Sequence, residues 1–363
     1  MAERLRVGVI GASLERGWGG EAHLPALAAL DDFEVAAVCT TRRESARAAA
    51  EVSGARHALT DPAALVALDD VDIVAVCVKV PEHFELVTLA LDAGKHVYCE
   101  WPLAADAEQA ATLARRARRA RVKAIVGLQA RADPALVRAR ELLAEGAIGP
   151  LRSAVLTGTT LLGGPQVPRA YVFGTDVAAG MNVLTVPAGH ALDALCACAG
   201  EPREVQARLT TVNRRATVIE TGETLAVSAP DTVQMTLALE HDVVASVHVQ
   251  GGAPGSLFRL ELLGAEGRLE LSSVGHVQRG GLRLAAAHGG APLEAVPTEI
   301  ADGPAANVAR LYARLGDAIR DGAPVEPDFG LAAERQRLLE AAMTASATGR
   351  RQPISKRRGD PGG

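Results

Sequence analysis

The apolar residues in the first third of the chain fall in short continuous runs that alternate with longer stretches of helical spacing. The runs lie at residues 5–10, 33–39, 71–78, 96–99 and 123–128. Short apolar runs of this kind are typical of parallel strands that are buried on both faces. Strands that alternate with helices form a doubly wound parallel sheet, so we predict an α/β domain over residues 1–130.

The second half of the chain has strands that follow one another without helices between them. Apolar and polar residues alternate clearly from Val233 to Leu239. Strands are predicted at residues 151–159, 203–212, 231–240, 243–251, 257–263, 267–272 and 281–286. Consecutive strands pair in antiparallel fashion, so residues 131–350 are predicted to form an α+β domain with a large, mostly antiparallel sheet.

Glycine and proline residues mark the limits of these domains. A stretch at residues 145–150 ends a predicted helix and marks the region of the domain boundary, shortly after the limit at residue 130. Residues 160–179 are predicted to be a loop that forms a wall of the pocket. Helices at residues 304–321 and 329–347 are predicted to return to the first domain, and residues 351–363 to form a disordered tail.

The composition is that of an ordinary globular protein. The 363 residues are 48% hydrophobic and 22% charged, with a net charge of −5, which argues against a nucleic-acid or membrane-surface role. The apolar runs are too short to span a bilayer, and the N-terminus runs straight into a strand, so no signal peptide is expected. The five cysteines show no metal-binding spacing and predict core thiols in a reducing cytoplasm, with no metal site.

The turn after the first strand is the first candidate for chemistry. Gly11 lets the chain turn sharply, Ser13 stands where a second glycine of G-x-G-x-x-G would be, and the loop is stretched to Gly17, Gly19 and Gly20. A strand, a glycine turn and a helix bring backbone N–H groups toward a pyrophosphate. The alternative is a plain βα turn. The cofactor-binding candidates in this loop are Gly11, Ser13 and Trp18.

The ends of the next strands supply the other cofactor candidates. Strand two ends in Thr40, Thr41, Arg42 and Arg43, where NAD-binding chains usually place a carboxylate for the ribose 2′-hydroxyl. Hydroxyl and guanidinium groups suit a 2′-phosphate, so we predict NADP, with NAD as the alternative. The candidates beyond strands three and four are Lys79, Pro81, His83, Glu100 and Trp101.

Three stretches resemble a known family. Gly8–Gly11, Ala93–Leu103 and Gly189–Asp193 are similar to motifs of the Gfo/Idh/MocA oxidoreductases. Val78–His83, together with Glu100–Ala104, resembles the Gal80-like branch, which includes an NADP-binding transcriptional regulator. The resemblance implies a Rossmann domain followed by a C-terminal α/β domain, and activity on sugars or cyclitols. It also implies a homo-oligomer formed through the C-terminal sheet.

The chain departs from the family pattern at two polar positions. The resemblance implies a Glu-Lys-Pro motif whose lysine helps to bind substrate and to transfer a proton, but Trp101 stands at that position. It also implies an aspartate four residues before the histidine of the second motif, where this chain has Val186. That histidine, His190, is kept, so the catalytic candidates are His190 first, and Lys79 or Tyr171 as alternatives.

Several functions are compatible with these residues. The first is an NADP-dependent oxidoreductase that acts on a sugar or sugar-like carbonyl or alcohol. The second is a catalytically silent NADP-binding sensor, and the third is a lyase or epimerase that recycles its cofactor internally. The predicted substrate-binding residues are Trp101, Gln129, Asn182, His190 and Asp193.

Overall fold

The computed structural model describes residues 4–15, 17–301 and 303–354. The chain divides into two compact units. The first consists of Met1–Asp133, Gln278–Gly280 and Ala301–Glu334, and the second of Pro134–Val277, Gly281–Ile300 and Arg335–Gly363. Each unit is therefore assembled from segments that are far apart in the sequence.

The first unit contains a six-stranded parallel sheet in the order β3-β2-β1-β4-β5-β6. Its strands are β1 (Leu5–Ile10), β2 (Phe33–Cys39), β3 (His57–Leu59), β4 (Ile73–Val76), β5 (His96–Glu100) and β6 (Ala124–Gly127). The predicted doubly wound parallel sheet is thus confirmed. The edge strand β3 was not predicted, because three residues are too few to show a pattern.

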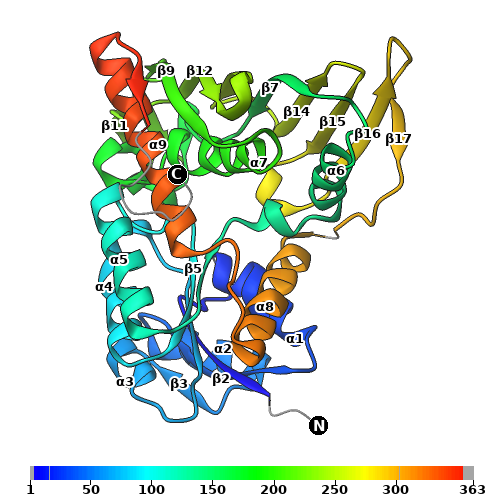
Figure 1. The fold of residues 1–363 in the computed structure, drawn as a ribbon. Coiled ribbons are helices and arrows are strands. Elements are labelled where there is room, and N and C mark those ends of the chain that lie inside the picture. The colour runs from blue at the N-terminus through cyan, green and yellow to red at the C-terminus, as the bar shows by residue number, and fades with distance from the viewer. Residues whose placement is uncertain (1–3, 16, 302, 355–363) are drawn as a thin grey trace. The chain divides into compact units, whose positions relative to one another are not determined.

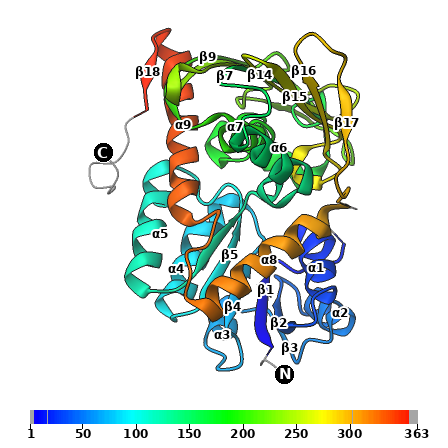
Figure 2. The same ribbon diagram turned by 45° about the vertical axis from the view of Figure 1, so that its right-hand side comes forward.

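Helices cover both faces of this sheet (Figure 1). They are α1 (Leu24–Ala28), α2 (Arg43–Ser53), α3 (Pro62–Val66), α4 (Val80–Asp92), α5 (Ala107–Ala120) and α8 (Gly303–Asp321), with the short helices η1 (Gly19–His23) and η2 (Gln129–Ala132). Helix α5 begins where the Asp106 carboxylate accepts a hydrogen bond from the Gln109 N–H at 2.8 Å. Figure 2 shows α8 crossing the sheet beside α1, and its residues Tyr312 and Leu315 pack into the same core as Phe33.

Three cysteines lie at the carboxyl ends of strands in this unit. Cys39, Cys77 and Cys99 are buried and carry free thiols. Burial raises the pKa of the Cys39 thiol to about 11, with a further contribution from the Asp61 carboxylate. These thiols therefore stay protonated at neutral pH and fill space in the core.

The second unit is built on a nine-stranded sheet in the order β17-β16-β15-β14-β7-β13-β12-β9-β18. All neighbours pair in antiparallel fashion except β7 and β13, so the predicted sheet is confirmed. Its strands are β7 (Leu151–Thr159), β9 (Pro202–Thr210), β12 (Thr232–Leu239), β13 (Val244–Gln250), β14 (Leu257–Gly264), β15 (Gly267–Val274), β16 (Arg283–His288), β17 (Glu294–Val296) and β18 (Gln352–Pro353).

One face of this sheet is buried and the other is exposed over its central strands. Val233, Met235 and Leu237 of β12 are buried, whereas Gln234 and Thr236 between them are exposed. Helices α6 (Pro134–Ala144) and α7 (Gly189–Ala199) lie against the sheet in Figure 1. Helix α9 (Phe329–Thr348) contains the division between the units, which falls after Glu334.

Residues 160–179 are more ordered than the predicted loop. They contain β8 (Gln166–Val167) and the 3₁₀ helices η3 (Arg169–Thr175) and η4 (Val177–Ala179). Strand β8 belongs to a small three-stranded sheet with β10 (Arg215–Val218) and β11 (Thr224–Ala226). The remaining short helices are η5 (Leu184–Ala188), η6 (Glu240–Asp242) and η7 (Val277–Arg279).

The start of the predicted tail has to be corrected. Gln352 and Pro353 form β18 against β9, and the Ile354 N–H donates to the Arg203 carbonyl at 2.8 Å. The edge of β9 presents backbone groups that need partners, and this short strand supplies them. The rest of the predicted tail, residues 355–363, lies outside the described residues. Over the described residues, no helix combines the length and apolar character that a membrane crossing needs.

Candidate functional site

The glycine turn after β1 allows an unusually close approach of the backbone. Gly11 has a φ of +93°, and a Cβ atom there would lie 2.4 Å from the Cys77 carbonyl oxygen. A Cβ atom on Gly19 would lie 2.4 Å from the Gly11 oxygen, and one on Gly20 would lie 2.3 Å from the Ser13 oxygen. Only glycine fits at these points, which are the roles that a dinucleotide fingerprint gives to its glycines.

The turn therefore packs its own backbone tightly at the start of η1, as a dinucleotide-binding turn does. Ser13 and Trp18 lie in the same loop, between Gly11 and Gly19. The spacing differs from G-x-G-x-x-G, which is why the sequence pattern alone was ambiguous. The chemistry of this cradle, made of backbone N–H groups and little side-chain bulk, fits a dinucleotide.

Glu100, at the end of β5, is held by a buried network of hydrogen bonds. His23 Nε2 lies 2.9 Å from its Oε1, and Gln129 Nε2 donates to Oε1 at 3.0 Å and to Oε2 at 2.8 Å. The other ring nitrogen of His23, Nδ1, lies 2.8 Å from the Tyr312 hydroxyl. Glu100 is only 8% exposed, so this network fixes the backbone that leads into Trp101.

Trp101 and His83 are both buried next to this strand end. Trp101 is 5% exposed. The His83 ring lies between two backbone oxygens, with Nδ1 2.8 Å from the Pro102 carbonyl and Nε2 3.1 Å from the Val78 carbonyl. Burial lowers the pKa of His83 below its usual value. His83 therefore ties the start of α4 to the segment after Trp101.

The other residues predicted around α4 and β2 are exposed, except for Thr40. Lys79 is exposed and precedes α4, whose first turn contains Pro81. Thr40 is buried, and its hydroxyl donates to the Arg42 carbonyl at 2.8 Å. Thr41 and Arg42 are exposed, and the Arg42 guanidinium pairs with Glu15 at 2.7 Å.

In the second unit, His190 is a buried histidine at the start of a helix. It lies in the first turn of α7, is 2% exposed, and its Nδ1 has no hydrogen-bond partner among the described residues. Burial lowers the pKa of His190 well below its usual value, and the nearby His276 lowers it further. A neutral imidazole is therefore expected at pH 7.

The other predicted residues of this unit have structural contacts. Asn182 Oδ1 accepts hydrogen bonds from the N–H groups of Leu184 and Thr185, at 3.0 and 3.2 Å, and so begins the helix that leads into α7. Asp193 is 1% exposed and accepts a hydrogen bond from Arg335 Nε at 2.9 Å. Tyr171 lies in η3 and is 46% exposed.

Comparisons with known proteins match both units. Residues 5–128 match the Gfo/Idh/MocA oxidoreductase family with its NAD-binding Rossmann fold, and residues 134–273 match the C-terminal domain of Gal80p. The dehydrogenase aclE of Aspergillus oryzae is 30% identical over 288 residues, which cover 75% of this chain and 77% of that protein. The chain belongs to the Gfo/Idh/MocA oxidoreductase family.

Two further similar proteins are a regulatory protein and a dehydrogenase. The galactose/lactose metabolism regulatory protein GAL80 of Kluyveromyces lactis is 28% identical over 268 residues, covering 69% of this chain and 59% of that protein. A structure of levoglucosan dehydrogenase in complex with NADH and L-sorbose superposes with a TM-score of 0.85, at 22% identity, over 97% of this chain and 99% of that one. At this level of identity, the superposition establishes that the two chains share a fold and nothing more.

Two side chains that lie beside predicted site residues, Arg279 and His276, were not identified from the sequence. Arg279 forms an ion pair with Glu21, and its guanidinium lies 5.5 Å from the centre of the Trp18 ring. His276 lies beside His190, with ring centres 5.4 Å apart. Neither residue belongs to a local motif, because each comes from a turn far along the chain from the group it meets.

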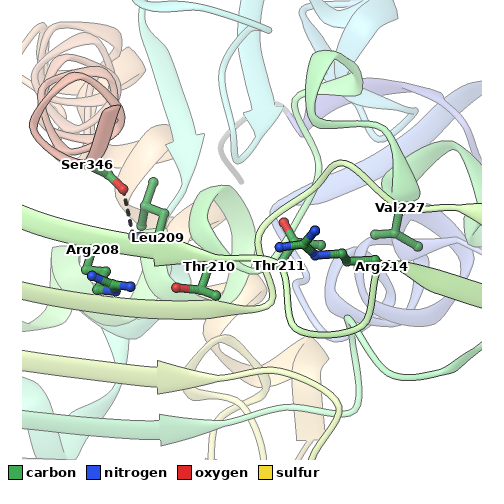
Figure 3. A pocket seen from close by; sticks show the side chains of 7 residues that line it. All are labelled: Arg208, Leu209, Thr210, Thr211, Arg214, Val227 and Ser346. Carbon is green, nitrogen blue, oxygen red and sulfur yellow. Dashed lines mark hydrogen bonds between the residues drawn. The ribbon is translucent and has the colours of Figure 1, made fainter. Parts of the chain in front are cut away.

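One pocket of the second unit is separate from the predicted residues. It has a volume of about 590 Å³ and lies at the end of β9 (Figure 3). Its lining residues are Arg208, Leu209, Thr210, Thr211, Arg214, Val227 and Ser346. The Leu209 N–H donates to Ser346 Oγ at 2.8 Å, so part of this edge of β9 is satisfied by a side chain.

Proposed function

We propose that this chain is an NADP-dependent oxidoreductase that acts on a sugar or sugar-like alcohol or carbonyl. The observation that carries the proposal is the environment of His190. Its buried imidazole offers an Nδ1 atom without a hydrogen-bond partner among the described residues. The position matches the family histidine of the second motif, so we assign it the role of acid and base.

Oxidation of an alcohol carbon removes a hydride from that carbon and a proton from its hydroxyl group. When bound, NADP supplies the hydride acceptor. His190 is neutral at pH 7, because burial lowers its pKa, and is therefore ready to accept the hydroxyl proton. In the reverse reaction the protonated ring returns that proton to the carbonyl oxygen. Lys79 and Tyr171 remain the alternative proton donors, in that order.

The cofactor-binding part of the proposal rests on the first unit. Gly11, Ser13 and Trp18 would hold the pyrophosphate side, where added side-chain bulk at the glycines would clash. The Thr41 hydroxyl and the Arg42 guanidinium would face the 2′-phosphate of NADP, and Thr40, whose hydroxyl donates to the Arg42 carbonyl, would hold this turn beside it. Binding of NADPH should accordingly be tighter than binding of NADH.

The strand ends would complete the site. Lys79 and Pro81 would contact the cofactor, and Trp101 would stack on a nicotinamide or sugar ring in place of the family lysine. Glu100 and His83 are engaged in buried hydrogen bonds, so they would hold Trp101 and the start of α4 in position. Gln129, Asn182 and Asp193 would shape the substrate side.

A specific observation favours a second candidate. Residues 134–273 match the Gal80p C-terminal domain, and a GAL80 regulatory protein is among the relatives. Trp101 and Val186 stand where the family resemblance implies a lysine and an aspartate, and neither side chain transfers a proton. A catalytically silent NADP-binding sensor would keep the glycine cradle and lose turnover.

The test begins with the dinucleotide that the purified protein retains, identified by absorbance and mass spectrometry. Turnover is then measured with a panel of sugars and both cofactors, in the unmodified protein and in His190→Asn. We expect turnover to fall by about 10²-fold with NADPH affinity nearly unchanged, whereas His241→Asn, at an exposed histidine in η6, serves as the matched control. Absence of turnover with every sugar, with NADPH still bound, would favour the sensor.

We also propose that a second copy of the chain covers the exposed face of the nine-stranded sheet. Gln234 and Thr236 of β12 and Ser246 and His248 of β13 are exposed on this face, in facing pairs. None of these four residues is an aspartate, glutamate, lysine or arginine, so a second sheet could pack against them. Light scattering should give a dimer or larger species, and Thr236→Arg should dissociate it; a monomeric unmodified protein would contradict the proposal.

A further inference from the structure

The two imidazoles of the second unit are held at a defined distance and angle. The ring centres of His190 and His276 are 5.4 Å apart, and the ring planes meet at 82° in an edge-to-face arrangement. His276 follows β15 in a turn after Gly275 and is half-buried. Because His190 is buried, the edge of one ring and the face of the other meet where water is scarce.

A hydrogen bond fastens the His276 ring to the helical segment that carries His190. His276 Nε2 lies 3.2 Å from the Pro187 carbonyl oxygen. A carbonyl oxygen only accepts hydrogen bonds, so Nε2 must carry a hydrogen atom and donate. Pro187 belongs to η5, which runs directly into α7, so the bond ties His276 to the turn just before His190.

We propose that His276 is a positioning residue that keeps His190 in its neutral, proton-accepting form. The inference rests on the proposed function, because it assigns His276 a task only where His190 is the acid and base. His276 itself need not touch the substrate. Its task is to set the ring orientation of His190 and to make the charged form of His190 costly.

The physical reason is the repulsion of two cations at short range in a place of low polarity. Burial already disfavours the imidazolium form of His190 and lowers its pKa. A positive charge on His276 disfavours it further, and among the described residues His276 is the single titratable group whose charge contributes to this lowering. Asp193, one turn along α7, has its carboxylate engaged by Arg335.

This arrangement has a chemical consequence for the proposed reaction. A base must be unprotonated when the substrate hydroxyl arrives, and protonation below pH 6.5 would remove an ordinary histidine from that task. With His276 in place, His190 stays available for proton removal at lower pH. A carboxylate in the same position would have the opposite effect, because it would stabilise the imidazolium.

The direct test is an NMR titration of histidine side chains in the full-length protein, with the His190 signal assigned through His190→Asn. Two variants remove the second imidazole: His276→Gln, whose amide can still donate to the Pro187 carbonyl, and His276→Phe, which keeps a ring. We expect the pKa of His190 to rise by about 0.5–1 unit in both variants, while remaining below its usual value because burial persists. The exposed His241→Gln, in η6 and outside the strands of the sheet, is the matched control and should leave the pKa of His190 unchanged.

An unchanged His190 pKa in the folded His276→Gln protein would overturn the proposal, whether or not the phenylalanine variant folds. Kinetics provide a second measurement. The acid limb of the kcat/KM profile should move to higher pH in His276→Gln, with little change at pH 8. A shifted pKa without turnover on any sugar would leave the coupling of the two rings intact and refute the oxidoreductase. Turnover without a shift of the His190 pKa would support the oxidoreductase and refute the coupling of the two rings.

Discussion

His23 Nε2 lies 2.9 Å from Glu100 Oε1, although the two residues are 77 positions apart in the sequence. His23 ends η1, the first helical turn after the glycine loop, and Glu100 ends β5. The bond therefore joins the glycine loop to the strand end that carries Trp101. Two places where we propose cofactor contacts are thus held together by one buried pair.

This pair predicts a stability cost for a mild substitution. Glu100→Gln replaces one acceptor oxygen by an N–H₂ group, which would face the donors of Gln129 and His23. We expect the free energy of unfolding to fall by about 2–3 kcal/mol in urea titrations. Glu108→Gln, at an exposed carboxylate on α5, is the control. Equal stability of the two variants would show that the network is dispensable.

The glycine cradle predicts that an added methyl group prevents binding. Gly19→Ala places a Cβ atom 2.4 Å from the Gly11 oxygen, so the loop must move. We expect a loss of about 1–3 kcal/mol in stability and a clear loss of NADPH affinity by fluorescence titration. Gly290→Ala, where a Cβ atom meets nothing within 4 Å, should change neither quantity. Full NADPH binding by the Gly19 variant would remove the cradle from the proposed site.

The ion pair of Arg42 with Glu15 predicts an effect on NADPH binding that NADH binding does not share. Both side chains are more than half exposed, and they lie 2.7 Å apart. A 2′-phosphate would compete with Glu15 for the Arg42 guanidinium, so Glu15→Gln should tighten NADPH binding and leave NADH binding unchanged.

Removal of the arginines tests the same contact from the other side. Arg42→Ala and Arg43→Ala should weaken NADPH selectively, and Arg47→Ala, at an exposed position one turn along α2, is the matched control. Fluorescence titration with both cofactors decides between these outcomes. Equal affinities of the unmodified protein for NADPH and NADH would contradict the assignment of NADP.

Asp193 is expected to matter for folding as well as for any substrate. Arg335 is 2% exposed and pairs with both Asp193 and Glu201. Asp193→Asn removes one of the two carboxylates that balance the buried charge of Arg335, so the free energy of unfolding should fall by about 3–5 kcal/mol. Thermal unfolding should show this, and Glu204→Gln, which breaks an exposed pair with Arg351, should have a much smaller effect. A fully stable Asp193→Asn protein that loses sugar binding would instead support a direct substrate contact.

The lowered pKa of His190 predicts how stability depends on pH. Below pH 6.5 the unfolded chain takes up a proton on this residue that the folded protein does not, so the free energy of unfolding decreases as pH falls. His83 and His96 act in the same direction, because burial lowers the pKa of each. The loss of Tm between pH 7.5 and 5.5 should therefore be smaller in His190→Asn than in the unmodified protein. The same slope in both would contradict a buried neutral His190.

The sequence determined the order and type of the main elements. Apolar runs and alternation gave the parallel strands of the first unit and the consecutive strands of the second, because side-chain periodicity is a local property of the chain. It also placed Gly11 and His190 at the ends of such elements. Local patterns did not reveal β3 or β18, since strands of two or three residues exist only through the neighbour that they pair with.

Only the tertiary structure decided which side chains meet. Glu100 is paired by His23 and Gln129, Trp18 is covered by Arg279, and His190 faces His276. Each of these contacts joins residues from different elements, and the distance between such residues depends on how helices pack on sheets rather than on any spacing in the sequence. The state of His190 follows the same rule, because its pKa is set by burial and by a neighbouring ring that no local motif encodes.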